Sequence, residues 1–237
     1  AMAYGTESVR PVDVIVGPGN VYVSVAKREV AGEVGVPSSF AGPSEVVVVA
    51  DGSVPAEYAA IDLMVQVEHG ADSVAWLVAW DSDVADRIVE VVAKLLETAP
   101  RRDVIAANLA ANGYVALVDG PVEAIEVVNR IAPEHLELLT ADPDALVPAV
   151  RNAGAVFCGA FAPASVGDYV AGPNHVLPTY GSARWAGALR VDDFLKHIHV
   201  VSVDEAGLAR LAPHVAALAG AEGLPTHAES VRMRGAR

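Results

Sequence analysis

Cysteine is nearly absent from this sequence of 237 residues. Cys158 is the single one, so the chain cannot form an internal disulfide, and a reducing compartment suits it best. The surrounding segment, "AVFCG", is apolar, which indicates a buried core residue rather than a nucleophile. We therefore expect a cytoplasmic protein.

Basic residues are scarce as well. The chain carries 16 Lys and Arg against 30 Asp and Glu, which gives a formal net charge of −14. Proteins that bind nucleic acid neutralise its phosphates with clusters of basic side chains, and the sequence contains no such cluster. The charge balance therefore argues against a nucleic-acid partner.

Long apolar runs are also missing. The longest, Val46–Ala50 and Val74–Trp80, are far shorter than the ~20 residues of a membrane-spanning helix. Hydrophobic residues still make up 53% of the chain and charged residues 19%, a balance typical of a compact globular protein.

What the sequence does contain is a regular alternation of short apolar segments and helical patterns. The expected strands are 12–16, 45–50, 74–80, 114–118, 136–140, 155–158 and 199–203. The expected helices are 20–31, 55–68, 84–98, 122–130, 145–152 and 205–219. Such alternation predicts an α/β fold with a mostly parallel sheet that helices cover on both faces.

Polar residues at the turns of this pattern are candidates for a functional site, each with a structural alternative. In "VGPGN" the free backbone N–H groups suit an anion, but Asn20 suits a helix cap equally well. Gln66 and His69, three residues apart, share a helical face and suit a metal, although a histidine in a last helical turn often only complements the helix dipole.

Two later segments add further candidates. The glycine-punctuated loop "ASVGDYVAGPNHVLP" carries Asp168 and His175, where Asp168 is equally typical of a turn. "EGLPTHAESV" carries Glu222 and His227, and His227 there suits a surface position at a helix start. Amide, imidazole and carboxylate donors together suit zinc or a similar divalent ion.

An acid and an imidazole are adjacent in "RIAPEHLELLT". Glu134 and His135 follow Pro133 and precede an apolar strand pattern. They are either a pair of proton-transfer groups or the polar beginning of a strand, and their own spacing leaves both readings open.

Six segments, read together, resemble the histidinol dehydrogenase family. They are "AYGTESVRPVDVIVGPGNVYVSVAKREV", "AGPSEVVVVAD", "QVEHGADS", "APEHLEL", "SVGDYVAGPNHVLPT" and "EGLPTHAESV". They follow the family's order along nearly the whole chain, which makes the resemblance far more specific than any one segment. The beginning, "AMAYGTESV", reads as the end of a helix, and the chain resembles roughly the C-terminal half of a family member.

The resemblance implies a zinc-dependent enzyme that oxidises L-histidinol through L-histidinal to L-histidine with two NAD. Its zinc ligands, one ion per subunit, would be Gln66, His69, Asp168 and His227. The same four residues would contact substrate, together with Ser44, His135 and Glu222. Asn20 would contact NAD.

The resemblance also implies separate tasks for the adjacent acid and imidazole. His135 would take the alcohol proton, and Glu134 would activate water for the aldehyde step. Because adjacent side chains diverge along a strand, we expect both residues to lie on the turn before the strand, with Pro133 directing the chain into it.

The family's architecture implies incomplete Rossmann-like domains with a C-terminal helical extension. Residues 1–43 would end one such domain, 44–188 would form a second with the metal and catalytic residues, and 189–237 would form a mainly helical dimer arm. In the implied intertwined homodimer, Glu222 and His227 serve the partner's site. The alternatives are a related zinc- and NAD-dependent dehydrogenase for another small polar alcohol, or an inactive fragment that keeps the scaffold.

Overall fold

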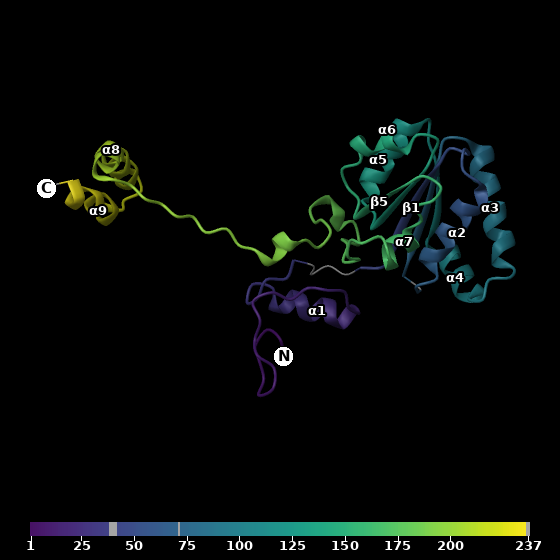
Figure 1. The fold of residues 1–237 in the computed structure, drawn as a ribbon, viewed down its shortest axis with the longest axis horizontal. Helices are drawn as coiled ribbons and strands as arrows, with labels where there is room; N and C mark the ends of the chain where they lie inside the picture. Colours follow the sequence, from purple (N-terminus) through teal and green to yellow (C-terminus); the bar gives the residue numbers. More distant parts are fainter. Residues whose placement is uncertain (38–41, 71, 236–237) are drawn as a thin grey trace. The chain divides into compact units, whose positions relative to one another are not determined.

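The computed structural model describes residues 1–37, 42–70 and 72–235. It divides into two compact units, Ala1–Phe194 and Leu195–Arg237, which are described separately below (Figure 1). The expected domain boundary near residue 43 adjoins residues 38–41, which are outside the described part of the chain, and it stays a prediction.

The first unit is built on a parallel sheet, as the alternation predicts. Its five strands within the described residues are β1 (Glu45–Ala50), β2 (Val74–Ala79), β3 (Gly113–Leu117), β4 (His135–Leu139) and β5 (Ala155–Cys158). Their order is β3-β2-β1-β4-β5, and every neighbouring pair is parallel. The first strand, β1, is therefore central, and the chain adds β2 and β3 on one side of it before β4 and β5 on the other.

Helices cover both faces of this sheet. They are α2 (Ala56–Val67), α3 (Ser82–Leu96) and α4 (Arg102–Asn112) on one face, and α5 (Pro121–Ile131) and the short α6 (Pro143–Leu146) on the other. In β1, Val46 and Val48 pack against the first group, whereas Val47 and Val49 pack against the second. This double burial explains the uninterrupted valine run, since a central parallel strand has two apolar faces.

Local signals account for where several helices begin and end. The Asp81 carboxylate accepts a hydrogen bond from the Asp83 amide at 2.8 Å and caps the start of α3. Pro121 is the first residue of α5, where its missing N–H is not needed. Helix α5 ends at Ala132, whose φ of 56° turns the chain sharply toward β4.

The amino-terminal residues carry α1 (Val21–Val30) and no extended strand ladder within the described part. The expected strand at 12–16 is therefore wrong: Val14 forms only an isolated bridge with Gly35. A strand pattern needs a neighbouring strand to satisfy its backbone groups over several residues, and this segment has such a neighbour at one position only.

Two helices of the first unit were not expected from the sequence. Helix α4 has a weakly amphipathic, alanine- and asparagine-rich pattern, and α7 (Ala164–Tyr169) occupies part of the segment expected to be a loop. Short helices with small residues lack the apolar spacing on which a helix prediction depends.

The second unit consists of α8 (Glu205–Ala221) and α9 (Pro225–Gly235), which pack against each other. The expected strand at 199–203 is not formed, and Val200 and Val201 are largely exposed. Helix α9 begins at Pro225, so His227 lies in its first turn. No helix in the described parts of the chain is both long and apolar enough to cross a membrane.

Candidate active site

Glu134 and His135 lie at the amino end of β4, the second strand from one side of the sheet. The strand begins at His135, so the expectation that both residues precede it is wrong by one residue. The two side chains nevertheless converge, with Glu134 Oε2 3.7 Å from His135 Nδ1. Glu134 lies before the strand, after Pro133 and after Ala132, whose backbone is in the left-handed conformation. The alternation of side chains along a strand therefore does not apply to Glu134, and the pair is not separated.

A glycine allows the backbone of the neighbouring strand to come close to this pair. Gly154, just before β5, donates its N–H to the Pro133 carbonyl at 2.9 Å. A Cβ at residue 154 would lie 2.6 Å from the Glu134 carbonyl oxygen. The close approach buries Glu134 and His135 to 6% and 2% exposure.

Burial shifts both side chains toward their neutral forms. It raises the pKa of Glu134 to about 7, and the nearby carboxyls of Glu45 and Asp168 add to the rise. It lowers the pKa of His135 to about 4, although Asp168 opposes that change. At neutral pH, therefore, the imidazole is uncharged and the Glu134 carboxyl is between its two protonation states.

Asp168 joins this pair from α7. Its Oδ1 atom lies 3.7 Å from His135 Nε2 and 3.2 Å from His175 Nδ1. The His175 ring stacks on the His135 ring with centroids 5.2 Å apart. The predicted loop segment thus delivers both an acid and a second imidazole to the site, and His175 was a candidate that the sequence did not tie to a role.

Donor atoms of Glu134, His135 and His175 all lie within 4.8 Å of one another, which is close enough for one small cation. None of these three is an expected zinc ligand, but the expected ligand Asp168 contacts both histidines. The proximity of His175 depends on the fold of residues 164–178, so no spacing rule in the sequence could have revealed it.

Glu45 is a further residue of the site that sequence reasoning missed. Its N–H donates to Glu134 Oε2 at 3.2 Å. Burial raises the pKa of its carboxyl to about 6, and the nearby backbone N–H groups of Gly181, Tyr180 and Glu134 oppose that rise. Glu134 and Glu45 therefore hold each other in place. The segment "AGPSEVVVVAD" contains this residue, but the resemblance implied a role only for Ser44.

Gln66 and His69 lie at the carboxyl end of α2, beside the amino edge of the sheet. Gln66 is buried and His69 is exposed. His69 Nδ1 lies 3.2 Å from the Gln66 carbonyl oxygen. Asn108 on α4 donates to the Val67 carbonyl at 3.0 Å and also to the Gly70 carbonyl, and so holds the turn that presents both residues.

Several buried polar atoms of this region have no hydrogen-bond partner among the described residues. They are Gln66 Nε2, both ring nitrogens of His135, Asp168 Oδ1 and Glu45 Oε2. Buried polar atoms are normally paired, so a group of unpaired ones at one place indicates a site for a ligand. A 180° flip of the Gln66 side-chain amide would place its oxygen where Nε2 now lies.

The other predicted site residues are Ser44, Asn20, Glu222 and His227. Ser44 directly precedes β1, and its carbonyl accepts the Val74 N–H at 2.9 Å. Asn20 caps α1, because its Oδ1 accepts the Val23 N–H at 3.1 Å. Glu222 and His227 are exposed residues of the second unit, at the end of α8 and within α9.

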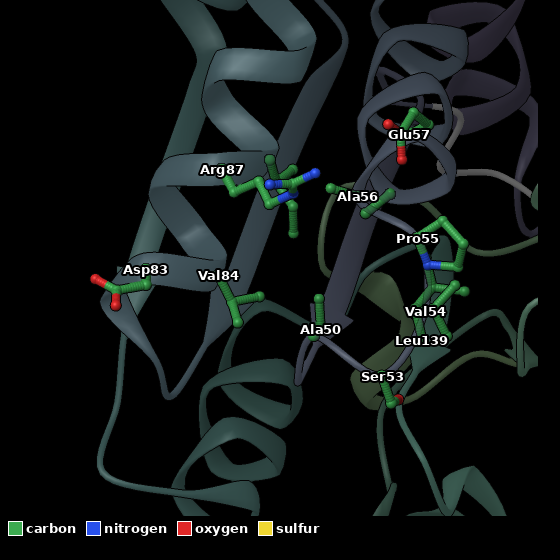
Figure 2. Close-up of a pocket in the computed structure, with 13 residues that line it drawn as sticks. Ala50, Ser53, Val54, Pro55, Ala56, Glu57, Asp83, Val84, Arg87 and Leu139 are labelled. Atoms are coloured by element: carbon green, nitrogen blue, oxygen red, sulfur yellow. The ribbon is translucent and has the colours of Figure 1, made fainter.

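A cavity of about 490 Å³ lies at the opposite edge of the sheet. Figure 2 shows it between the carboxyl ends of β1 and β4 and the beginnings of α2 and α3. Its lining is mostly apolar, with Arg87, Asp83 and Glu57 at the rim. None of its lining residues carries a buried polar side-chain atom without a partner.

Comparisons with known proteins agree on one family. The family model of histidinol dehydrogenase matches residues 1–235. The histidinol dehydrogenase of Gluconobacter oxydans is 49% identical over 99% of this chain and 54% of its own length. That of Bacillus subtilis is 47% identical over 99% of this chain and 55% of its own.

A crystal structure of histidinol dehydrogenase from Elizabethkingia anophelis is similar in fold. It superimposes with a TM-score of 0.91 at 36% identity and covers 98% of this chain and 54% of that chain. The chain thus spans about half the length of the relatives that it matches.

Proposed function

This chain belongs to the histidinol dehydrogenase family, and from that premise we propose that it supplies the metal and catalytic residues of an enzyme that oxidises L-histidinol to L-histidine. The observation that carries the proposal is the group of unpaired buried atoms around Glu134 and His135. Such a group is expected where a polar substrate and an ion complete the hydrogen bonding.

Gln66, His69, Asp168 and His227 would hold zinc. Two of the four, Gln66 and Asp168, have buried side-chain atoms without a partner among the described residues, so the donor set fits an ion of this kind. Zinc, when bound, would orient the substrate's polar groups. His227 belongs to the second unit, and in the proposed homodimer it and Glu222 reach the site of the partner subunit.

His135 would act in the first oxidation, from alcohol to aldehyde. The hydroxyl oxygen gives its proton to the imidazole while the carbon gives up a hydride. The low pKa of His135 keeps the ring uncharged before the reaction, and the neighbouring Asp168 carboxyl favours the protonated ring that forms when it takes the proton. We assign the accepting atom as Nε2, because Nε2 faces Asp168 whereas Nδ1 faces Glu134.

Glu134 would act in the second oxidation, from aldehyde to acid. Its carboxylate takes a proton from water, and the resulting hydroxyl adds to the aldehyde carbon before a second hydride leaves. A pKa of about 7 suits a general base at neutral pH, because the group is partly ionised and still basic.

Asn20 and the glycine-rich turn before it would lie against NAD, which accepts one hydride in each oxidation when bound. A Cβ built on Gly17 would meet no atom within 4 Å, so the backbone there is open to a ligand. Asn20 already caps α1. Its contact with the cofactor is therefore expected in addition to that structural task.

The test is turnover by zinc-loaded protein with L-histidinol and NAD, followed by chromatography of the product. We expect two NADH and one L-histidine for each histidinol consumed. Preference for a simple or sulfonated diol would instead indicate the related dehydrogenase. Zinc binding without NADH formation would indicate a chain that keeps the scaffold but not the activity.

A further inference from the structure

Glu137 is a carboxyl residue in the most buried part of the sheet. It lies in β4 between Leu136 and Leu138 and is 0% exposed. It pairs in register with Val48 of β1 and Phe157 of β5. Burying a carboxylate among aliphatic side chains costs several kcal/mol unless the carboxylate finds partners, and the proposed reaction makes no use of Glu137.

The partners of Glu137 belong to two helices of the site. The Ala164 amide, at the start of α7, donates to Glu137 Oε1 at 2.7 Å. The carboxyl of Asp62 in α2 lies within hydrogen-bonding reach of Glu137. Glu137 therefore joins three elements of the fold, namely β4, α2 and α7.

Each of these three elements carries one group of the candidate site at a fixed distance along the chain. His135 is two residues before Glu137, so both point to the same face of the sheet. Gln66 follows Asp62 by one helical turn, and Asp168 follows Ala164 by one helical turn. A shift of α2 or α7 against Glu137 would therefore move Gln66 or Asp168 relative to His135.

The pair of acids requires a proton. Two carboxylates have no hydrogen to share, so an Asp62–Glu137 hydrogen bond exists only when one of them is protonated. Burial, together with the charge of Asp62, raises the pKa of Glu137 to about 9. Since Oε1 accepts the Ala164 amide, Oε2 is left to carry the proton, and it accepts no hydrogen bond from the described residues.

We propose that Glu137 is a positioning residue, which holds α2 and α7 against β4 through a hydrogen bond shared with Asp62 and another accepted from Ala164. In this way it sets Gln66 and Asp168 relative to His135. The inference rests on the proposed function, because the arrangement matters for the metal and substrate that these residues would bind.

Two substitutions of Glu137 by residues of similar size distinguish its hydrogen bonding from simple packing. Glu137→Gln is neutral and keeps both a donor and an acceptor, as the protonated acid does. Glu137→Met fills the same space without either. Leu138→Met, on the opposite face of β4, is the matched control for an altered side chain in the same strand.

Zinc affinity, measured by competition with a chromophoric chelator, is the first readout. We expect Glu137→Met to weaken zinc binding by about 10–100-fold, as loss of an outer-shell partner does. Glu137→Gln and Leu138→Met should remain close to wild type, and the KM for histidinol should follow the same order. If Glu137→Gln binds zinc as poorly as Glu137→Met, or if both bind normally, the inference is wrong.

A second readout does not depend on metal or activity. At pH 8, above the pKa of Glu134 and below that of Glu137, the wild-type infrared spectrum minus that of Glu137→Gln should contain the carbonyl band of a protonated carboxylic acid. Hydrogen exchange in α7 should accelerate in Glu137→Met and not in Glu137→Gln. Absence of the band, or equal exchange in the two variants, would overturn the inference even if the wild type neither binds zinc nor oxidises histidinol.

Discussion

The two edges of the central sheet differ in what they contain. At the amino edge, Glu134 and Asp168 each lie 3.7 Å from the buried ring of His135. At the carboxyl edge lies a cavity of about 490 Å³, the usual place for ligands in open parallel sheets (Figure 2). Yet most unpaired buried side-chain atoms of the described residues are at the amino edge, whereas Thr140 Oγ1 is at the carboxyl edge and the residues that line the cavity have none.

The contrast shows that the volume of a cavity and the presence of unpaired buried polar atoms are separate indicators of a functional site. Apolar space can remain after helices pack on a twisted sheet, and it need not be filled. Buried donors and acceptors without partners cost about 1–3 kcal/mol each, so a protein retains them together only where something pairs them. We therefore assign the chemistry to the amino edge.

Loss of the proton-transfer groups should have the largest effect. We expect His135→Asn to slow histidinol oxidation by about 10²–10⁴-fold, because general base catalysis contributes about that much. Zinc content, measured by atomic absorption, should remain near wild type. Glu134→Gln should instead slow oxidation of supplied histidinal by a similar factor while largely sparing the alcohol step. Equal effects of the two changes on both half-reactions would contradict the division of tasks.

Weakening the turn after α2, which presents the expected zinc ligands Gln66 and His69, should have an intermediate effect on zinc affinity. Asn108→Leu removes hydrogen bonds to the Val67 and Gly70 carbonyls. We expect zinc affinity to fall by about 10–100-fold. Asn129→Leu is the matched control, because Asn129 is also a buried asparagine and donates to the Ala149 carbonyl at 3.0 Å. If both variants lose the same affinity, the effect is one of general stability.

The pH dependence of the two half-reactions should differ more modestly. Glu134 must be ionised to accept a proton, and its pKa is about 7, so the histidinal step should slow about tenfold from pH 8 to pH 6. His135 is already uncharged above its pKa of about 4, so the same change leaves its accepting form intact. Single-turnover rates of each step across this range would test the difference. An identical pH profile for both steps would remove the assigned role of Glu134.

A substitution in the cavity at the carboxyl edge should have the smallest effect on activity. Arg87 is an exposed basic residue of the cavity lining. We expect Arg87→Glu to leave kcat/KM for histidinol and for NAD within about twofold of wild type, with stability changed by about 0.5 kcal/mol or less. A large loss of activity would show that the cavity takes part in the reaction, and the comparison of the two edges would fail.

Sequence reasoning succeeded where the signal was local and periodic. The valine run of β1 and the apolar segment of β2 are largely buried, so the pattern alone predicts them. The apolar pattern also predicts β5, although this outer strand has no fully buried residue and Cys158 in it is only partly buried. It failed at 12–16 and 199–203, where an extended pattern lacks a partner strand. It also missed α7, whose glycine and small residues hide the helix that carries Asp168.

The sequence by itself determined the parallel α/β fold and, through six segments in order, the family and the pair Glu134 and His135. Only the tertiary structure revealed which edge of the sheet gathers the polar groups and that His175, Glu45 and Glu137 belong there. Helical and strand periods depend on neighbours within a few residues. The contacts of Glu137 with Asp62 and Ala164 instead join residues far apart in the chain, and they exist only after burial has removed the water that would otherwise separate them.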